Sequence, residues 1–242
     1  MIDPARAALL LIDMQMGFID AASPLCVAGA AASVSACARA LAAARGRGVR
    51  VVHVRRAYRA DGSDVEPVRF EAWAAGGRPL SPGSDLPDSS EPPAQLAAAP
   101  GERVVVKPRF SAFFCTPLRQ ELSVAGVDTV VLAGTTTPNC IRATCYDALS
   151  LGFNVVVLQD ATSSRTPEVQ RANIDDMAHI GAHVMSVADF ERRGLADVRD
   201  LAGEMRARFG ASCAAAPDAA FRAAGSAAEP CTGGALNAGG AL

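Results

Sequence analysis

The sequence predicts a three-layer, Rossmann-like α/β sandwich, in which helices cover both faces of a parallel sheet. Short apolar runs alternate with amphipathic stretches along most of the chain, which is typical of successive strand–helix–strand units. The 242 residues, half of them hydrophobic and a fifth charged, suffice for one large domain or two small ones and exclude wholesale disorder. We expect six strands, mostly parallel, in the order 3-2-1-4-5-6 with right-handed crossovers.

Six short runs have the composition of strands. The first, AALLLID, is apolar until it ends on a carboxylate. In chain order the predicted strands are Ala7–Asp13, Val49–Val54, Arg103–Val106, Asp128–Ala133, Asn154–Leu158 and the weaker His183–Val187.

Capping residues, prolines and glycines mark the helix boundaries. Glycines at 46 and 48 end the first helix, and Thr-Pro pairs at 116–117 and 137–138 combine an N-cap with proline at the first helical position. The predicted helices are Ser33–Arg45, 116 to about 125, 137 to about 151, Pro167–Ile180 and Ala196–Phe209.

Two segments interrupt this alternation. Tyr58–Gly101 is rich in Gly, Pro, Ser and Asp, with one turn of helix expected near 69–75, and such a long irregular stretch is often a lid or a binding loop. Residues 211–242 are dominated by Ala and Gly and hold too few large apolar groups to offset the entropy of ordering. We therefore expect one domain over residues 1–210, followed by a disordered tail.

Charge and cysteine usage exclude several kinds of partner. The net charge of −2, without basic runs, argues against nucleic acid or an anionic membrane. No apolar run approaches the roughly 18 residues of a membrane span, and Asp3 stands where a signal peptide has basic residues. The seven cysteines form no CxxC pair, which favours reduced thiols, so we expect a cytoplasmic protein.

Three complementary polar side chains stand near the carboxyl ends of predicted strands. Asp13 ends the first strand, Lys107 ends the third, and the fourth leads through three threonines into the helix that carries Cys140. Ligands of an open parallel sheet bind at this edge, near the point where strand order reverses. We therefore expect an acid, a base and a thiol to converge there.

Cys140 is the third residue of its predicted helix if Thr137 is the N-cap. Unpaired N–H groups, the helix dipole and a nearby Lys107 ammonium would stabilise a thiolate, so we expect a lowered pKa for this thiol. Without such partners Cys140 would be a small buried apolar residue, which is how we interpret Cys145 farther along the same helix.

Four stretches resemble the isochorismatase-like cysteine hydrolases. They are LLLIDMQ at 9–15, KPRFSAF at 107–113, GTTTPNCIRATCYDAL at 134–149 and LQDATSSRTPEVQRANIDDM at 158–177, in the family's order. The resemblance covers about residues 5–190. It implies a catalytic triad of Asp13, Lys107 and Cys140, a non-proline cis peptide at Thr135–Thr136, and assembly as a dimer or tetramer.

The resemblance also implies acyl transfer through a thioester. Asp13 would take the thiol proton and return it to the leaving amine, while Lys107 orients the carboxylate and keeps the site positive. The Cys140 thiolate would attack a small amide or ureido carbonyl, and the backbone N–H groups of Thr136 and Cys140 would form the oxyanion hole.

Further residues are candidates for the substrate pocket. Those beside the triad strands, which are either pocket walls or ordinary packing residues, are Gln15, Phe18 and Phe110. Arginines that either pair with a substrate carboxylate or face solvent are Arg55, Arg56, Arg59 and Arg142.

Departures from the family narrow the predicted activity. Nicotinamidase-like members carry a metal-binding Asp-x-His and a further His after the second strand, whereas that stretch here reads HVRRAYRADGSD. We interpret its one histidine, His53, as a core residue, and Gly181 interrupts the pair His179 and His183. We therefore expect no metal and no cofactor.

The sequence thus predicts a metal-independent cysteine hydrolase that cleaves the C–N bond of a small amide or ureido substrate. Two alternatives stay open: a vinyl-ether hydrolase of the isochorismatase type, which uses no cysteine nucleophile, and a non-catalytic binding member of the same fold. A nucleotide-binding Rossmann protein is disfavoured, because no glycine-rich phosphate loop follows the first strand.

Overall fold

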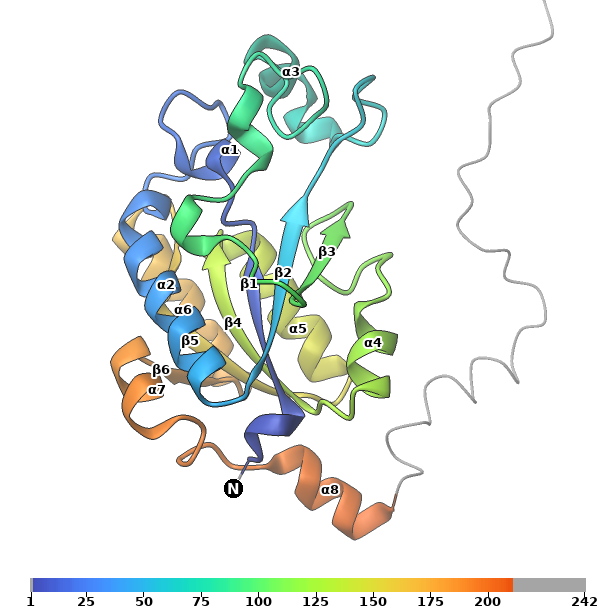
Figure 1. Cartoon of the computed structure of the whole chain (residues 1–242), viewed down its shortest axis with the longest axis vertical. Coiled ribbons are helices and arrows are strands. Elements are labelled where there is room, and N and C mark those ends of the chain that lie inside the picture. The colour runs from blue at the N-terminus through green and yellow to red at the C-terminus, as the bar shows by residue number, and fades with distance from the viewer. Residues whose placement is uncertain (1, 211–242) are drawn as a thin grey trace, which may run out of the picture. The chain divides into compact units, whose positions relative to one another are not determined.

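The computed structural model describes residues 2–210, and in them six parallel strands form one sheet (Figure 1). The strands are β1 (Ala7–Ile12), β2 (Arg50–Arg56), β3 (Arg103–Lys107), β4 (Thr129–Thr135), β5 (Asn154–Ser163) and β6 (His183–Met185). Their order is β3-β2-β1-β4-β5-β6, which confirms the predicted fold class and strand order. The order reverses between β1 and β4, where ligands bind in sheets of this kind.

Helices cover both faces of the sheet, as Figure 1 shows. One layer contains α2 (Ala30–Gly46) and α7 (Val187–Arg193), and the other contains α4 (Leu118–Val124), α5 (Arg142–Ser150) and α6 (Pro167–His179). Alternate residues of β1 enter the two cores, Leu9 and Leu11 on the α2 side and Leu10 and Ile12 on the α5 side. Because both faces are buried, this strand reads as a continuous apolar run.

The carboxyl-terminal elements differ from the prediction. β6 ends at Met185, two residues early, because Ser186 caps α7 with a hydroxyl that accepts a hydrogen bond from the Asp189 N–H. The predicted helix Ala196–Phe209 is shorter, since α8 begins only at Leu201 and ends at Phe209.

Near the other end of the chain, the sequence patterns did not predict α1 (Met16–Ile19), a single turn after β1.

The stretch between β2 and β3 is irregular but packed. It contains α3 (Pro67–Ala75) and two short 3₁₀ helices, Pro87–Ser90 and Ala94–Leu96. It forms its own small core, in which Trp73 is buried and its indole N–H donates to the Pro79 carbonyl at 2.8 Å. This segment is therefore an ordered insertion over the carboxyl end of the sheet (Figure 1).

The chain divides into two compact units, Met1–Gly203 and Glu204–Leu242, and the sheet with its covering helices belongs to the first. The predicted disordered tail, residues 211–242, lies outside the described residues. Across residues 2–210, none of the helices combines the length and apolar character that crossing a membrane requires.

Candidate active site

The ends of β1 and β3 bring an acid and a base together. Asp13 directly follows the six buried residues of β1 and has a positive φ of 53°, a conformation that aspartate tolerates better than most side chains. Lys107 is the last residue of β3, and its side chain is fully buried. Its Nζ lies 2.7 Å from Asp13 Oδ2, so the two form a buried ion pair.

A glycine allows β4 to pass close to β1 at the same edge. Gly134 has a φ of 117°, and a Cβ at this position would stand 2.0 Å from the Ile12 carbonyl oxygen. No other residue fits there without moving backbone. The following peptide, Thr135–Thr136, is cis, which confirms the expectation drawn from the resemblance.

Cys140 lies in a single π-helical turn, Thr137–Ile141, that leads into α5. The N-cap of this turn is Thr136 and not Thr137 as predicted, and no side chain caps it. The Thr137 hydroxyl instead bonds to the Ser163 carbonyl at 2.9 Å and to Gln170 at 2.7 Å. These bonds hold the turn against β5 and α6.

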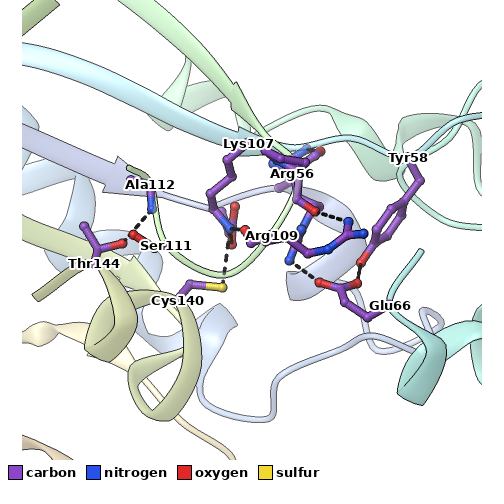
Figure 2. A network of polar contacts seen from close by, with 12 residues as sticks. Arg56, Tyr58, Glu66, Lys107, Arg109, Ser111, Ala112, Cys140 and Thr144 are labelled. Atoms are coloured by element: carbon purple, nitrogen blue, oxygen red, sulfur yellow. Dashed lines mark hydrogen bonds and ion pairs between the residues drawn. The ribbon is translucent and has the colours of Figure 1, made fainter. Parts of the chain in front are cut away.

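Lys107 contacts both other members of the predicted triad, as Figure 2 shows for its contact with the thiol. Its Nζ lies 3.5 Å from Cys140 Sγ, besides the 2.7 Å contact with Asp13, and it also donates to the Arg109 carbonyl at 3.0 Å. Asp13 Oδ1 has no hydrogen-bond partner among the described residues. This carboxylate therefore has a free acceptor site beside the ion pair.

The protonation of Cys140 differs from the prediction. The pKa of its thiol is raised to about 11, mainly by burial and also by the Asp13 carboxylate, while Lys107 and Arg56 act in the opposite direction. The expected lowering fails because Cys140 is only 3% exposed and burial disfavours the charged thiolate. The site therefore places a thiol of raised pKa beside the Asp13–Lys107 ion pair.

A cavity of about 420 Å³ opens over Asp13 and Cys140. Apolar side chains, including Phe18, form much of its wall, and two cations also line it, Arg69 from α3 and Arg165 from the segment after β5. Asp13 is the one carboxylate among the described residues that line it. The cavity thus suits a small molecule that carries a negative group.

Neither of these arginines is among the site residues predicted from the sequence. Arg165 follows β5, which runs to Ser163 and not to Leu158 as predicted. With the observed strand end, the same strand-end rule that found Asp13 would have pointed to Arg165. Arg69 carries no such signal, because only the fold of the insertion brings α3 over the cavity.

The predicted pocket residues have different surroundings. Phe18 lines the cavity above Cys140, whereas Phe110 lines a neighbouring cavity of about 360 Å³. Gln15 lines neither cavity, because its buried amide is already bonded. Its Nε2 donates to the carbonyls of Arg56 and Ser90 at 2.9 and 3.0 Å, and its Oε1 accepts from the Arg56 N–H at 2.8 Å.

The other candidate ligands have partners of their own. Arg56 is paired with Glu66 at 2.5 Å, Arg142 is paired with Asp176 at 2.9 Å, and neither lines the cavity above Cys140. The buried His53 bonds to Glu102 at 2.9 Å. In the part of the chain that the structure describes, no three His, Cys, Asp or Glu side chains are grouped so that they could hold a metal ion.

Comparison with known proteins identifies the family of this chain. Residues 7–189 match the Isochorismatase domain, which is most of the chain. The chain belongs to the isochorismatase family. This isochorismatase-family protein is 39% identical over 183 residues to "Probable inactive nicotinamidase" of Arabidopsis thaliana, a match that covers 73% of this chain and 90% of the relative.

Two further likenesses support the same assignment. The isochorismatase-family protein is 33% identical over 201 residues to maleamate amidohydrolase of Pseudomonas putida, covering 82% of this chain and 89% of the relative. Among solved structures, an isochorismatase family protein from Desulfovibrio vulgaris matches with a TM-score of 0.73 and 43% identity, covering 77% and 97% of the two chains. The protein is thus a member of a hydrolase family that includes amidohydrolases, and the resemblance seen in the sequence is confirmed.

Proposed function

We propose that this protein hydrolyses the C–N bond of a small, negatively charged amide or ureide, with Cys140 as nucleophile and Asp13 as the proton acceptor. The observation that carries the proposal is the contact of one ammonium, Lys107 Nζ, with both the carboxylate and the thiol below a cavity lined by two arginines. A nucleophile, a base and an orienting cation within reach of one another are the parts that acyl transfer requires.

The free acceptor site of Asp13 fits the role of base. In the proposed reaction the thiol proton moves to Asp13 as Sγ forms a bond with the substrate carbonyl carbon. The C–N bond then breaks, the proton passes from Asp13 to the departing nitrogen, and water splits the thioester to restore the thiol. The N–H groups of Thr136 and Cys140 are the proposed oxyanion donors, each worth roughly 3–4 kcal/mol of transition-state stabilisation.

The cations of the cavity support a negatively charged substrate. Arg69 and Arg165 line it together with apolar side chains, and a guanidinium recognises a carboxylate through paired hydrogen bonds. The name of the maleamate amidohydrolase relative likewise denotes a substrate that carries both an amide and a carboxylate. We therefore place the amide of the substrate at Cys140 and its carboxylate toward these arginines.

The test is ammonia release from a panel of amides and ureides with and without a carboxylate, including maleamate and N-carbamoyl amino acids. We expect hydrolysis of a carboxylate-bearing member and a loss on the order of 10³-fold or more for Cys140→Ala. Cys145→Ala is the matched control, a buried cysteine that does not line the cavity, and should keep most of the activity. Hydrolysis that survives Cys140→Ala would exclude the cysteine mechanism.

A non-catalytic binding protein is the second candidate, and the name of the Arabidopsis relative, a probable inactive nicotinamidase, favours it. It predicts that the folded protein releases ammonia from no panel member. In that case a carboxylate-bearing amide should still slow the alkylation of Cys140, because the ligand would fill the cavity over the thiol. Catalytic turnover of any panel member rules this candidate out.

A further inference from the structure

Two fully buried cations stand side by side at the end of the sheet. Arg56 of β2 and Lys107 of β3 are register partners, so their side chains leave the same face of strands that lie about 4.8 Å apart. Neither side chain is exposed to solvent. Two buried like charges on neighbouring strands repel each other, so each is best held by a carboxylate of its own. Lys107 has Asp13, and Arg56 has Glu66.

Glu66 and the Tyr58 ring lie against the Arg56 guanidinium, as Figure 2 shows, and the Phe110 ring also contacts it. Arg56 Nη2 donates to Glu66 Oε1 at 2.5 Å, and the Tyr58 hydroxyl donates to Glu66 Oε2 at 2.7 Å. The guanidinium lies 5.4 Å from the ring centre of Tyr58 and 5.7 Å from that of Phe110. Burial acts to raise the pKa of Glu66, yet Arg56 and the Tyr58 hydroxyl hold it below its usual range, so this acid stays charged.

The hydrogen bonding of Arg56 is incomplete, although the residue is buried. Its Nε and Nη1 have no hydrogen-bond partner among residues 2–210. Buried donors without partners lose their hydrogen bonds to water and gain none in the protein, so an apolar side chain would serve the packing better. Stability alone therefore does not explain why a charged Arg56 is buried next to Lys107.

The charged groups that act on Cys140 come from four elements. Asp13 follows β1, Arg56 ends β2, Lys107 ends β3 and Arg69 lies on α3. When the thiol proton moves to Asp13, negative charge leaves the ion pair with Lys107 and appears on Sγ. Arg56 keeps its charge and its place throughout, because Glu66 fixes it, and it attracts that new charge.

We propose that Arg56 is a positioning residue of this site, whose fixed charge directs the Lys107 ammonium toward Asp13 and Cys140 and favours the thiolate. The proposal rests on the proposed role of Cys140 as nucleophile. It gives the Arg56–Glu66–Tyr58 set a function although none of the three lines the cavity above the thiol.

The test is the pH dependence of Cys140 alkylation by iodoacetamide, which needs no substrate. Trypsin cleaves after Arg119 and Arg142, and the peptide between them contains Cys140 as its one cysteine, so its mass reports this thiol alone. For Arg56→Met we expect a midpoint about one pH unit higher, or roughly tenfold slower alkylation at a fixed pH below it. Arg56→Lys keeps the charge and should restore most of the wild-type rate.

Arg55→Met is the matched control, because Arg55 precedes Arg56 on β2 but is partly exposed and 3.7 Å from Glu91. It should leave the alkylation profile unchanged. A folded Arg56→Met protein with the wild-type profile would overturn the proposal, and so would an Arg56→Lys protein that is shifted as far as Arg56→Met. If Arg56→Met does not fold, Arg56→Gln replaces it, since its amide can still bond to Glu66 without the charge.

The two proposals fail separately. Shifted alkylation in a protein that hydrolyses none of the amides refutes the proposed function and leaves the effect of Arg56 on the thiol standing. Hydrolysis that depends on Cys140, together with unshifted alkylation in Arg56→Met, refutes the role of Arg56 alone.

Discussion

Two clusters in this protein join an acid to basic groups from neighbouring elements, but they use the acid differently. In the Glu102 cluster, made of Arg45, His53 and Glu102, the carboxylate accepts two hydrogen bonds from Arg45 at 2.8 and 2.9 Å. It also bonds to His53 Nε2 at 2.9 Å and to the Ala99 N–H at 2.8 Å. Both of its oxygens are thus engaged, which ties α2, β2 and the start of β3 together.

In the Asp13 cluster, made of Asp13, Lys107 and Cys140, the carboxylate has the ammonium on one oxygen and a free acceptor site on the other. The two clusters also differ in which group has a shifted pKa. Arg45 above all lowers the pKa of Glu102 to about 2, whereas burial raises the pKa of the Cys140 thiol to about 11. The Glu102 carboxylate, bonded on both oxygens, stabilises the fold. The Asp13 carboxylate, with a free acceptor site beside a thiol, has the geometry to receive a proton, which is its proposed role.

The largest expected effect comes from removing the acid of the Asp13 cluster. Asp13→Asn removes the proton acceptor while it keeps the size of the side chain, so we expect the hydrolysis rate to fall on the order of 10³-fold or more. Initial rates on the best substrate of the panel measure this, with circular dichroism as the check that the variant is folded. A folded Asp13→Asn protein within tenfold of the wild-type rate would contradict the comparison.

The same change in the Glu102 cluster should act on stability instead. Glu102→Gln weakens charge-assisted bonds to Arg45, so we expect a loss of about 2 kcal/mol in the free energy of unfolding at pH 7 and little change in hydrolysis. Urea unfolding and initial rates measure the two quantities. If the variant loses activity but no stability, the assignment of this cluster to the fold is wrong.

The pH dependence of stability sharpens this prediction. An ordinary glutamate has a pKa near 4.5, and folding lowers that of Glu102, so the unfolded chain binds this proton more readily. The contribution of Glu102 to stability is therefore complete above about pH 4.5 and is lost as the pH falls toward 2. Between about pH 5 and pH 3, the wild type should lose stability more steeply than Glu102→Gln.

The smallest expected effect belongs to His53. Burial, followed by the nearby arginines, keeps its pKa below the usual 6.5 although Glu102 acts in the opposite direction, so stability falls as the pH drops below about 6.5. His53→Gln keeps a donor for Glu102 without this titration. It should cost less than about 1 kcal/mol at pH 8 and flatten the stability profile from about pH 6.5 to pH 5. A steeper profile in the variant would contradict the neutral state of His53.

The sequence predicted the parts of the site that depend on local patterns. Asp13 and Lys107 each end a mainly apolar run, and Cys140 follows the next predicted strand, so the strand-end rule was enough to bring them together. The pKa of the Cys140 thiol could not be predicted, because burial depends on side chains from distant parts of the chain.

Arg56 shows the same limit. In the stretch RRAYR it has the sequence environment of a solvated surface charge. Its burial follows from Glu66, ten residues later, and from the Phe110 ring beyond β3, and no periodicity connects these residues. The end of β6 differs from the prediction for a local reason, since Ser186 is the N-cap of α7 and not a further strand residue.

The insertion between β2 and β3 contributes to the cavity wall but none of the three residues of the Asp13 cluster. It is fastened by bonds from Tyr58 N to the Leu80 carbonyl and from Leu80 N to Ser89 Oγ, and Gln15 ties its end to the sheet at Ser90. α3 contributes Arg69 and its neighbours to the cavity wall, whereas Asp13 and Lys107 stand at strand ends and Cys140 in the turn before α5. Substitutions confined to Pro67–Ala75 can therefore change which molecules enter while the reacting atoms stay in place. Under the proposed function, Pro67–Ala75 is therefore the segment in which substitutions would alter substrate range with the least disturbance of Asp13, Lys107 and Cys140.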